Sequence, residues 1–429
     1  MLGLALCAAS CRLGDVTRHD VALRPEPAVD LVLRAFENHP LVALSDGAGH
    51  GQPDTVQFFA RLVRDARFPR TVRNVVVEFG NARYQPVMDR YISGDAVARD
   101  ELRHVWEDTT QVTGIWSLPM YEQMFAEVRT VNRTLPPSLR IRVLLGDPPI
   151  DWSSVTGPAD EDMNDWRDAH FAHIVQHEVL NRGSKALLLV GGAHLSRRVI
   201  FPNSLIHLLD ARLPGGTWVV SVLDIERVNR VTRPRLQSWT VPTGAPVSGT
   251  WLGKLDVRQI GLDLSEGLLE DDVDAVLLLA TSAPRQQEMP SLSPAYALEL
   301  RRRRALADTT LPFRGARIRF EEHAAAFDAA SREPLEEVLG YLLENRGLRL
   351  MVKAFADASE PDPVALSMTR AGALVDWLVE RGVGRDRLVP AGCGASRPIT
   401  FGRTAADRAI NRRAELVRLT ETAACAPPW

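Results

Sequence analysis

The chain of 429 residues has little net charge, few cysteines and, beyond its first residues, no apolar stretch long enough to span a bilayer. The formal net charge of −3 gives no reason to expect nucleic acid or a generally basic membrane surface as a partner. The four cysteines include no Cys-x-x-Cys pair, the spacing typical of metal sites. The Gly-x-Ser-x-Gly motif is also absent, which disfavours a serine hydrolase.

Residues 1–26 begin with MLGLALCAASCRLGD, an apolar segment with small residues that turns polar at Arg12. It is similar to the second half of a secretory signal, although the basic start is missing. The sequence around Cys11 loosely resembles a lipoprotein processing site, so acylation of Cys11 is one alternative and a short tail is the other. We expect export to the cell envelope, either to the periplasm or to association with the outer membrane. After export, Cys393 and Cys425 could pair.

Between residues 27 and 305, short apolar runs alternate with amphipathic helical stretches. This alternation predicts an α/β domain of layered type with a mostly parallel sheet. Residues 241–253 are rich in Pro, Gly and Ser and are expected to form a loop. The expected strands are 41–44, 75–77, 141–145, 186–190, 218–222 and 274–280.

Residues 306–315 are expected to be a linker, and residues 316–420 a second, compact domain. In that domain a strand near 317–320, a helix at 333–343, a strand at 348–356, a helix at 366–381 and a strand from 388 predict a small βαβαβ sandwich. Residues 421–429 are expected to form a tail. The four arginines at 301–304 are the only basic cluster, and we expect them to form a solvated helix end beside the junction.

The second domain carries a specific motif series. It reads FADASEPDPVALSMTRAGALVDWLVERGVGRDRLVPAGCGASRPI, followed by RAINRRAEL. An Asp follows a strand, Leu-Ser-x-x-Arg-Ala opens a helix, and Asn-Arg-Arg-x-Glu closes the series. In this order the motifs resemble the OmpA-like peptidoglycan-binding domain over about 100 residues.

The resemblance implies peptidoglycan as the partner, bound through the diaminopimelate of its stem peptide. By position, Asp357 would meet the ammonium end of that zwitterion and Arg370 its carboxylate end, since a guanidinium can donate two parallel hydrogen bonds. Arg412 would brace the site, or else form an exposed salt bridge. The chain departs from the family where Ala354-Phe355-Ala356 replaces Gly-His-Thr and the loop after Asp357 is about two residues short. Weak binding, or a domain kept only for folding, is the alternative.

Polar residues follow four predicted strands of the first domain. They are Asp46 and His50 after 41–44, Glu78 after 75–77, Asp147 after 141–145, and His194 after 186–190. Because the carboxyl ends of parallel strands meet at one edge of a sheet, these groups are predicted to share a site.

This order, with a helix opening at Arg167, resembles the erythromycin esterase-like and ChaN-like superfamily over about residues 30–305. The resemblance implies a hydrolase in which His50 is a general base that activates water. Glu78 would orient His50 or polarise a water, and His194 would be a second acid/base or an oxyanion stabiliser. Arg167 would hold a substrate carboxylate or balance the charge of Glu78. The first motif departs from the family, because Asp46 stands near the usual Glu.

Other interpretations stay open at this point. His50, Glu78, His194 and Asp147 could ligate a divalent metal, and the ChaN-like relatives bind haem. The histidines at 170, 173 and 177 share one helix face and are either solvated or ligands. A domain that has kept the fold and lost the reaction, as a scaffold or a small-ligand-binding protein, is the alternative to an enzyme.

Overall fold

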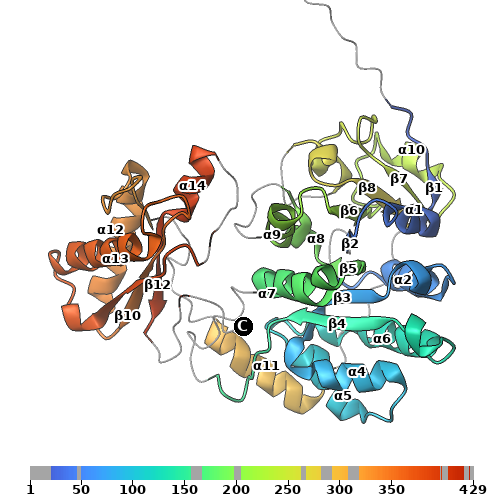
Figure 1. The fold of residues 1–429 in the computed structure, drawn as a ribbon, viewed down its shortest axis with the longest axis horizontal. Helices are drawn as coiled ribbons and strands as arrows, with labels where there is room; N and C mark the ends of the chain where they lie inside the picture. Colours follow the sequence, from blue (N-terminus) through green and yellow to red (C-terminus); the bar gives the residue numbers. More distant parts are fainter. Residues whose placement is uncertain are drawn as a thin grey trace, which may run out of the picture.

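The computed structural model describes residues 21–45, 50–155, 167–197, 204–261, 267–281, 292–307, 318–396, 398, 404–419 and 425. The signal-like segment around Cys11, Asp46 and most of the expected linker lie outside these residues. Two separate sheets organise the described chain (Figure 1). The protein is of mixed α/β class, as the sequence predicts.

The first sheet has eight strands in the order β1-β7-β8-β6-β2-β5-β3-β4. From β8 to β4 every neighbouring pair is parallel, whereas β7 pairs antiparallel with β8, and β1 with β7. The strands are β1 (Glu26–Pro27), β2 (Leu41–Ser45), β3 (Asn74–Asn81), β4 (Arg142–Asp147), β5 (Ala186–Val190), β6 (Thr217–Val222), β7 (Thr243–Pro246) and β8 (Ala275–Leu278).

Helices cover both faces of this sheet, because alternate residues of each buried strand point to opposite sides. In β2, for example, Val42 and Leu44 belong to one apolar cluster, and Leu41 and Ala43 to the other. The first cluster includes α1 (Ala28–Ala35), α2 (Pro53–Arg64), α4 (Gln85–Ser93), α5 (Arg99–Glu107) and α6 (Pro119–Asn132). The second includes α7 (Arg167–Ile174), α8 (Gly192–Leu195), α9 (Leu205–Arg212) and α10 (Arg233–Gln237).

The expectation of a loop over residues 241–253 is wrong in part, because β7 lies within it. Gly244 makes this strand possible. A Cβ atom at Gly244 would stand 2.5 Å from Leu277 Cδ2 and 2.6 Å from Leu31 Cδ2, so only glycine allows β7 to approach both neighbours. The turn-forming composition of the segment concealed a short strand.

The arginine run lies in α11 (Pro294–Ala307), and the expectation that it is simply solvated is wrong for Arg303. Its side chain is 4% exposed and donates to the Glu107 carbonyl and to Asp108 Oδ1, both at 2.7 Å. Arg302 and Arg304 are exposed but also donate to backbone carbonyls of the first domain. The run therefore fastens α11 to that domain.

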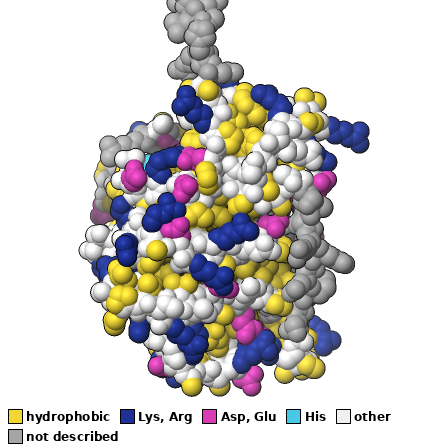
Figure 2. All heavy atoms as spheres, turned by 90° about the vertical axis from the view of Figure 1, so that its right-hand side faces the viewer, with side chains coloured by type: hydrophobic (Ala, Val, Ile, Leu, Met, Phe, Trp, Pro, Cys, Tyr) yellow, Lys and Arg dark blue, Asp and Glu magenta, His cyan; other side chains and the backbone are white. Residues whose placement is uncertain are grey.

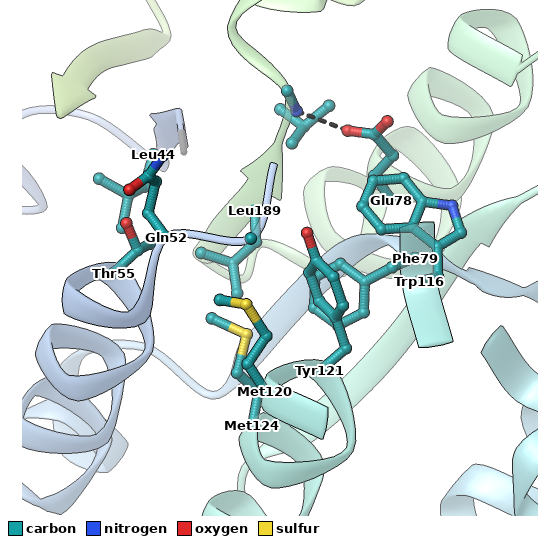
Figure 3. A pocket seen from close by; sticks show the side chains of 13 residues that line it. Leu44, Gln52, Thr55, Glu78, Phe79, Trp116, Met120, Tyr121, Met124 and Leu189 are labelled. Atoms are coloured by element: carbon teal, nitrogen blue, oxygen red, sulfur yellow. Dashed lines mark hydrogen bonds between the residues drawn. The ribbon is translucent and has the colours of Figure 1, made fainter. Parts of the chain in front are cut away.

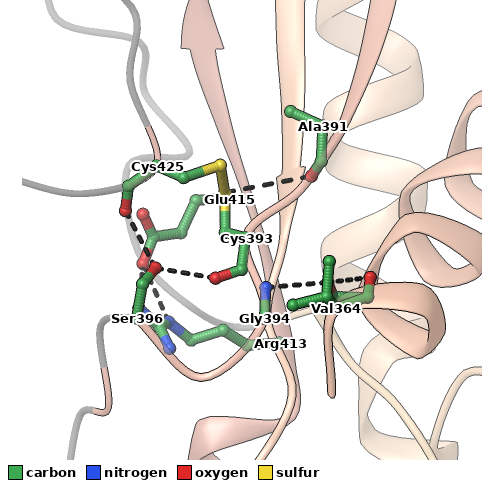
Figure 4. The surroundings of a disulfide bond; sticks show 9 residues. Val364, Ala391, Cys393, Gly394, Ser396, Arg413, Glu415 and Cys425 are labelled. Carbon is green, nitrogen blue, oxygen red and sulfur yellow. Dashed lines mark hydrogen bonds and ion pairs between the residues drawn. A yellow bond between two sulfur atoms is a disulfide. The ribbon is translucent and has the colours of Figure 1, made fainter. Parts of the chain in front are cut away.

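The second sheet has four strands in the order β11-β10-β12-β9. β10 pairs parallel with β11, and the other pairs are antiparallel. Its elements are β9 (Ile318–Arg319), α12 (Arg332–Glu344), β10 (Leu350–Ala354), α13 (Pro363–Val379), β11 (Leu388–Gly392), α14 (Ala405–Asn411) and β12 (Arg413–Arg418). A disulfide joins Cys393 to Cys425, so the end of the chain is tied to the segment after β11 (Figure 4).

No helix among the described residues is both long and apolar enough to cross a membrane. On the face drawn in Figure 2, basic and acidic side chains are interspersed with apolar ones. No area of a single charge sign dominates that face, which agrees with the small net charge of the sequence.

Candidate functional site

Of the predicted strand-end groups of the first domain, His50, Glu78, Asp147 and His194 lie among the described residues and come together at one edge of its sheet. Glu78 lies in an irregularity of β3, where the pairing with β4 shifts between Val77 and Asn81. Such a bulge changes the direction in which a side chain points. Glu78 is only 5% exposed, so it belongs to the interior of the site and is not a solvated turn residue.

Arg167, at the start of α7, lies between two buried carboxylates. Its Nη2 donates to Glu78 Oε1 at 2.9 Å and its Nε donates to Asp147 Oδ1 at 3.2 Å. Asp147 also accepts hydrogen bonds from the backbone N–H and the hydroxyl of Thr110, both at 2.7 Å. The guanidinium thus balances Glu78, one of the two roles that the sequence suggests for it.

His194, in the short helix after β5, joins the same network. Its Nε2 lies 3.6 Å from Glu78 Oε1, and its Nδ1 lies 2.6 Å from Asp168 Oδ1. Asp168 also accepts a hydrogen bond from the backbone N–H of Leu205 at 2.9 Å, which fixes the carboxylate beside the ring. His194 is therefore held between two acids.

His50 reaches the site from the segment after β2. Its ring packs edge-on against Trp116 with a centroid distance of 4.6 Å. Gly191 donates its N–H to Glu78, and a Cβ atom there would lie 2.8 Å from His50 Cε1 and 3.4 Å from Glu78 Oε2. His50 and Glu78 thus approach the same glycine, and a side chain at residue 191 would displace one of them.

Burial and charge set the protonation states in this cluster. Burial favours the neutral acid at Glu78, but His194, Arg167, His50 and the Gly191 N–H outweigh it and lower the pKa to about 2. Burial also disfavours a charged His194, yet the acids Asp168 and Glu78 raise its pKa to about 9. Near neutral pH the site therefore holds an ionised Glu78 and a protonated His194.

Asp147 differs from Glu78 although both touch Arg167. Burial raises the pKa of Asp147 to about 6, and the opposing effects of Arg167 and Thr110 do not cancel it. The pKa of Glu78 thus lies below the usual value of a carboxyl group and that of Asp147 above it, a separation typical of acid–base sites.

A small cavity of about 30 Å³ lies beside Glu78 and Gly191. Its wall is mostly apolar and includes Met120, Tyr121 and Met124 of α6, which point into it in Figure 3. Trp116 and Thr55 also line it, and neither the indole N–H of Trp116 nor the hydroxyl of Thr55 has a hydrogen-bond partner among the described residues. This volume holds about two water molecules, so a short apolar group would fit.

Within the described part of the chain, no three His, Cys, Asp or Glu side chains form a group that could hold a metal ion. The metal alternative therefore has no ligand set there. Of the three histidines of the helix face, His170 is buried and its Nδ1 contacts the Gly146 carbonyl at 2.8 Å. Burial lowers its pKa to about 4, and His173 stacks on His177 at a centroid distance of 4.2 Å.

In the second domain, Asp357 follows β10 and is 7% exposed. Its Oδ1 accepts the N–H and the hydroxyl of Ser359 at 3.0 and 2.6 Å, and its Oδ2 accepts Asn411 Nδ2 at 2.8 Å. Burial alone would raise the pKa of this carboxyl, but the bonds from Asn411 and Ser359 lower it. Asp357 is consequently a fixed anion.

Arg370, in α13, is fully buried and pairs with Glu360. Arg412 is 8% exposed, donates from Nε to the Phe320 carbonyl at 3.3 Å, and lies 3.9 Å from Glu322. Arg412 thus contacts the segment after β9 and is not a freely exposed salt bridge. The structure brings Asp357 and Arg370 close through Glu360, which accepts the Asp357 N–H at 3.0 Å.

Sequence reasoning missed several groups of both sites. Thr110 and Trp116 lie in segments without any strand-end signal, so only the folded chain shows their place. Asp168 could have been suspected, because it follows Arg167 at the start of a helix. Glu360 lies three residues after Asp357, in a loop without any pattern that marks it.

Comparisons with known proteins concern the second domain. Residues 319–412 match the model of the OmpA family. The peptidoglycan-binding protein ArfA of Mycobacterium tuberculosis (strain H37Rv) and that of Mycobacterium bovis are each 34% identical to this chain over 105 residues. These alignments cover 24% of this chain and 32% of each relative, so the chain spans about a third of the length of the curated relatives it matches.

Two solved structures are each similar to about a quarter of the chain. The peptidoglycan-associated lipoprotein from Burkholderia pseudomallei is 23% identical, with 24% of this chain and 91% of that chain covered and a TM-score of 0.23. The periplasmic domain of Helicobacter pylori MotB is 20% identical, with 24% and 78% covered and a TM-score of 0.22. The family match and the curated relatives agree with the motif series, and residues 319–412 form an OmpA-like domain.

Proposed function

We propose that this protein belongs to the cell envelope and associates with peptidoglycan through its OmpA-like domain. The observation that carries the proposal is the family match over residues 319–412, supported by relatives that are named peptidoglycan-binding proteins. The disulfide between Cys393 and Cys425 suits an exported domain, since disulfides persist in oxidising compartments.

Asp357 is the residue of this domain that we propose for the ammonium group of the stem peptide. Three hydrogen bonds from Ser359 and Asn411 hold its carboxylate, and a carboxylate has about four acceptor positions, so one remains for a ligand. Arg412 would support the site through its bond to the Phe320 carbonyl. The resemblance assigns the ligand carboxylate to Arg370, whose contacts make its substitution a test of folding before binding.

Co-sedimentation of the full chain with purified peptidoglycan tests this proposal. Asp357→Ala is expected to reduce the pelleted fraction strongly. Asp376→Ala is the matched control, because Asp376 is an exposed aspartate of α13 in the same domain. Unchanged pelleting of Asp357→Ala, with its fold verified by circular dichroism, would remove Asp357 from the binding site. No pelleting of the unaltered chain would refute the association itself.

A second candidate function concerns the first domain, for which we propose hydrolysis of a small ester. Glu78 lines a cavity with an apolar wall, His194 lies 3.6 Å from Glu78, and His50 approaches Gly191, which lines the same cavity. This arrangement is our reason to prefer an enzyme to an inert scaffold. In this mechanism His50 takes the proton from water as the water attacks the carbonyl carbon. The tetrahedral intermediate then breaks the ester C–O bond, and His50 returns the proton to the leaving alcohol. Ionised Glu78 orients His50 and stabilises its positive charge, and protonated His194 stabilises the developing oxyanion.

Hydrolysis of p-nitrophenyl acetate by the full chain tests the second candidate. The acetyl group is short enough for a cavity of about 30 Å³. His50→Ala is expected to lower kcat/KM by at least about 100-fold, the usual contribution of a general base. His177→Ala is the control, since His177 is exposed on the outer helix face. If the unaltered chain hydrolyses no faster than buffer, the scaffold or small-ligand alternative replaces the enzyme.

A further inference from the structure

Among the described residues of the OmpA-like domain, Glu360 and Arg370 form the most enclosed ion pair. Both side chains are 0% exposed. Arg370 Nη1 donates to Glu360 Oε2 and Nη2 donates to Glu360 Oε1, each at 2.6 Å. Two parallel bonds of this kind are the geometry in which a guanidinium binds any carboxylate, including that of a ligand.

The remaining donors of Arg370 also have partners inside the domain. Nε donates to the Ala324 carbonyl at 2.9 Å, Nη2 to the Glu321 carbonyl at 3.0 Å, and Nη1 to the Phe355 carbonyl at 3.4 Å. A guanidinium has five N–H groups, and these contacts use them all. Another carboxylate can reach Arg370 only if Glu360 leaves.

Glu360 is held as firmly from its other side. Its carboxylate accepts the backbone N–H of His323 at 2.9 Å and that of Asp357 at 3.0 Å. Although burial favours the neutral acid, Arg370 and these two N–H groups lower the pKa of Glu360. Glu360 is therefore an anion fixed between the two residues that the family resemblance assigns to a ligand.

We propose that Glu360 takes the place of a ligand carboxylate on Arg370, so that the domain binds cell-wall peptide through an ammonium group at Asp357 alone. This inference rests on the proposed peptidoglycan association. The preferred ligand is then a stem peptide whose side-chain amine has no charged carboxyl beside it. A lysine residue or an amidated diaminopimelate meets that description, and free diaminopimelate gains nothing from its extra carboxylate.

Glu360 competes with a ligand carboxylate for Arg370, and its attachment to the same chain favours Glu360. Glu360 is ten residues from Arg370 in the same chain, so it is always close to the guanidinium, whereas a ligand carboxylate must come from solution. The exchange also replaces one bidentate pair with an equal one, so it offers no gain in hydrogen bonds. The displaced Glu360 would lose the N–H groups of His323 and Asp357 as well.

Calorimetric titration of the full chain with two tripeptides tests the inference. Both are Ala-γ-Glu-diaminopimelate, one with the free carboxyl beside the side-chain amine and one with that carboxyl amidated. The unaltered chain is expected to bind them with Kd values within about threefold of each other. Preference for the free acid by tenfold or more would overturn the inference and leave the peptidoglycan proposal standing.

Substitutions of Glu360 test the same inference on the protein side. Glu360→Ala empties the position on Arg370, so it is expected to bind the free acid at least about tenfold tighter than the unaltered chain does, with no gain for the amide. Glu336→Ala, an exposed glutamate of α12, is the matched control and should change neither value. If Glu360→Ala does not fold, Glu360→Gln retains the side-chain volume and removes the competing charge. A folded Glu360 variant without this gain would overturn the inference.

The two failures are distinguishable. Binding of neither tripeptide by the unaltered chain, together with no co-sedimentation, would refute the peptidoglycan association and this inference with it. The comparison of acid and amide on the unaltered chain decides the inference even where every variant is unstable.

Discussion

Glu78 and Arg167 form a buried ion pair, with Arg167 Nη2 2.9 Å from Glu78 Oε1. The side chain of Arg167 is 13% exposed and that of Glu78 is 6% exposed. The pair joins the end of β3 to the start of α7, which are 89 residues apart in sequence. Because the same guanidinium also contacts Asp147, one cation offsets the charge of two interior acids. This relationship makes the site both a candidate for chemistry and a structural tie.

Arg167→Ala is expected to destabilise the first domain by about 3–5 kcal/mol, because it leaves buried carboxylates without their cation. Urea unfolding followed by tryptophan fluorescence measures this, since seven of the nine tryptophans precede residue 305. Arg99→Ala removes an exposed pair with Glu122 at 2.8 Å and should cost under about 1 kcal/mol. Equal effects of the two substitutions would show that the Arg167 network contributes no more stability than an exposed ion pair.

The sequence predicts much of this site, because strand ends follow from apolar runs. Glu78, Asp147 and His194 could be placed at one edge of a parallel sheet without coordinates. The bulge that turns Glu78 inward could not, since it depends on how β3 pairs with β4 beyond Val77. Thr110 contacts Asp147 from a segment between α5 and α6 that has no periodic pattern of its own.

The OmpA-like domain shows the same limit. Its motif series predicts the strand before Asp357 and the helix that carries Arg370. Pro363 at the first turn of α13 and Asp362 before it, which accepts the Ala365 N–H at 3.1 Å, are recognisable start signals for that helix. The inward position of Glu360 depends on the path of the loop between them, which no local pattern encodes.

The charge on His194 predicts a pH dependence of stability. Its pKa is raised from 6.5 to about 9 in the folded state, so its stabilisation is complete below pH 6.5 and is lost as the pH rises through 9. The loss is expected to reach about 3 kcal/mol at 1.36 kcal/mol for each pKa unit. Glu78 titrates at about 2, below this window, and Asp147, at about 6, titrates at its lower edge in the unaltered chain and the variant alike.

Urea midpoints between pH 6 and pH 10 measure this dependence. The unaltered chain should lose stability across the window, and His194→Gln should be less stable at pH 6 but nearly flat up to pH 9. A variant that keeps the slope of the unaltered chain would assign the titration to another group.

Arg303→Ala is expected to cost about 2–4 kcal/mol, because it removes the donor to Asp108 Oδ1 and one of the two donors to the Glu107 carbonyl, which keeps only the Tyr296 hydroxyl. The matched control is Arg301→Ala, two residues earlier, whose Nε donates only to the Ala297 carbonyl of its own helix at 3.3 Å. That control should change stability by under about 0.5 kcal/mol. Limited proteolysis within α11 gives a second measurement, since helix release would expose cleavage sites at the arginines.

Removal of the disulfide is expected to destabilise the OmpA-like domain. Cys393 and Cys425 are 32 residues apart, and closing a loop of that length restricts the unfolded chain by about 3–4 kcal/mol in the chain-entropy model. The serine substitutions Cys393→Ser and Cys425→Ser, made together, should therefore speed hydrogen exchange in β10 and β12. Ser396, whose hydroxyl donates to the Cys393 and Cys425 carbonyls at 2.7 and 3.1 Å, would hold the tail only weakly without the bridge (Figure 4).

Exchange in the first sheet is the internal control for that experiment, because the bridge lies wholly within the second domain. Reduction of the unaltered protein should reproduce the double variant, since both open the same loop. Hydrogen-exchange protection in β10 could instead stay unchanged in the reduced protein and in the double variant. That result would mean that the loop entropy is offset in the unfolded chain, and that β10, β12 and the apolar cluster around Leu374 stabilise the domain without the disulfide.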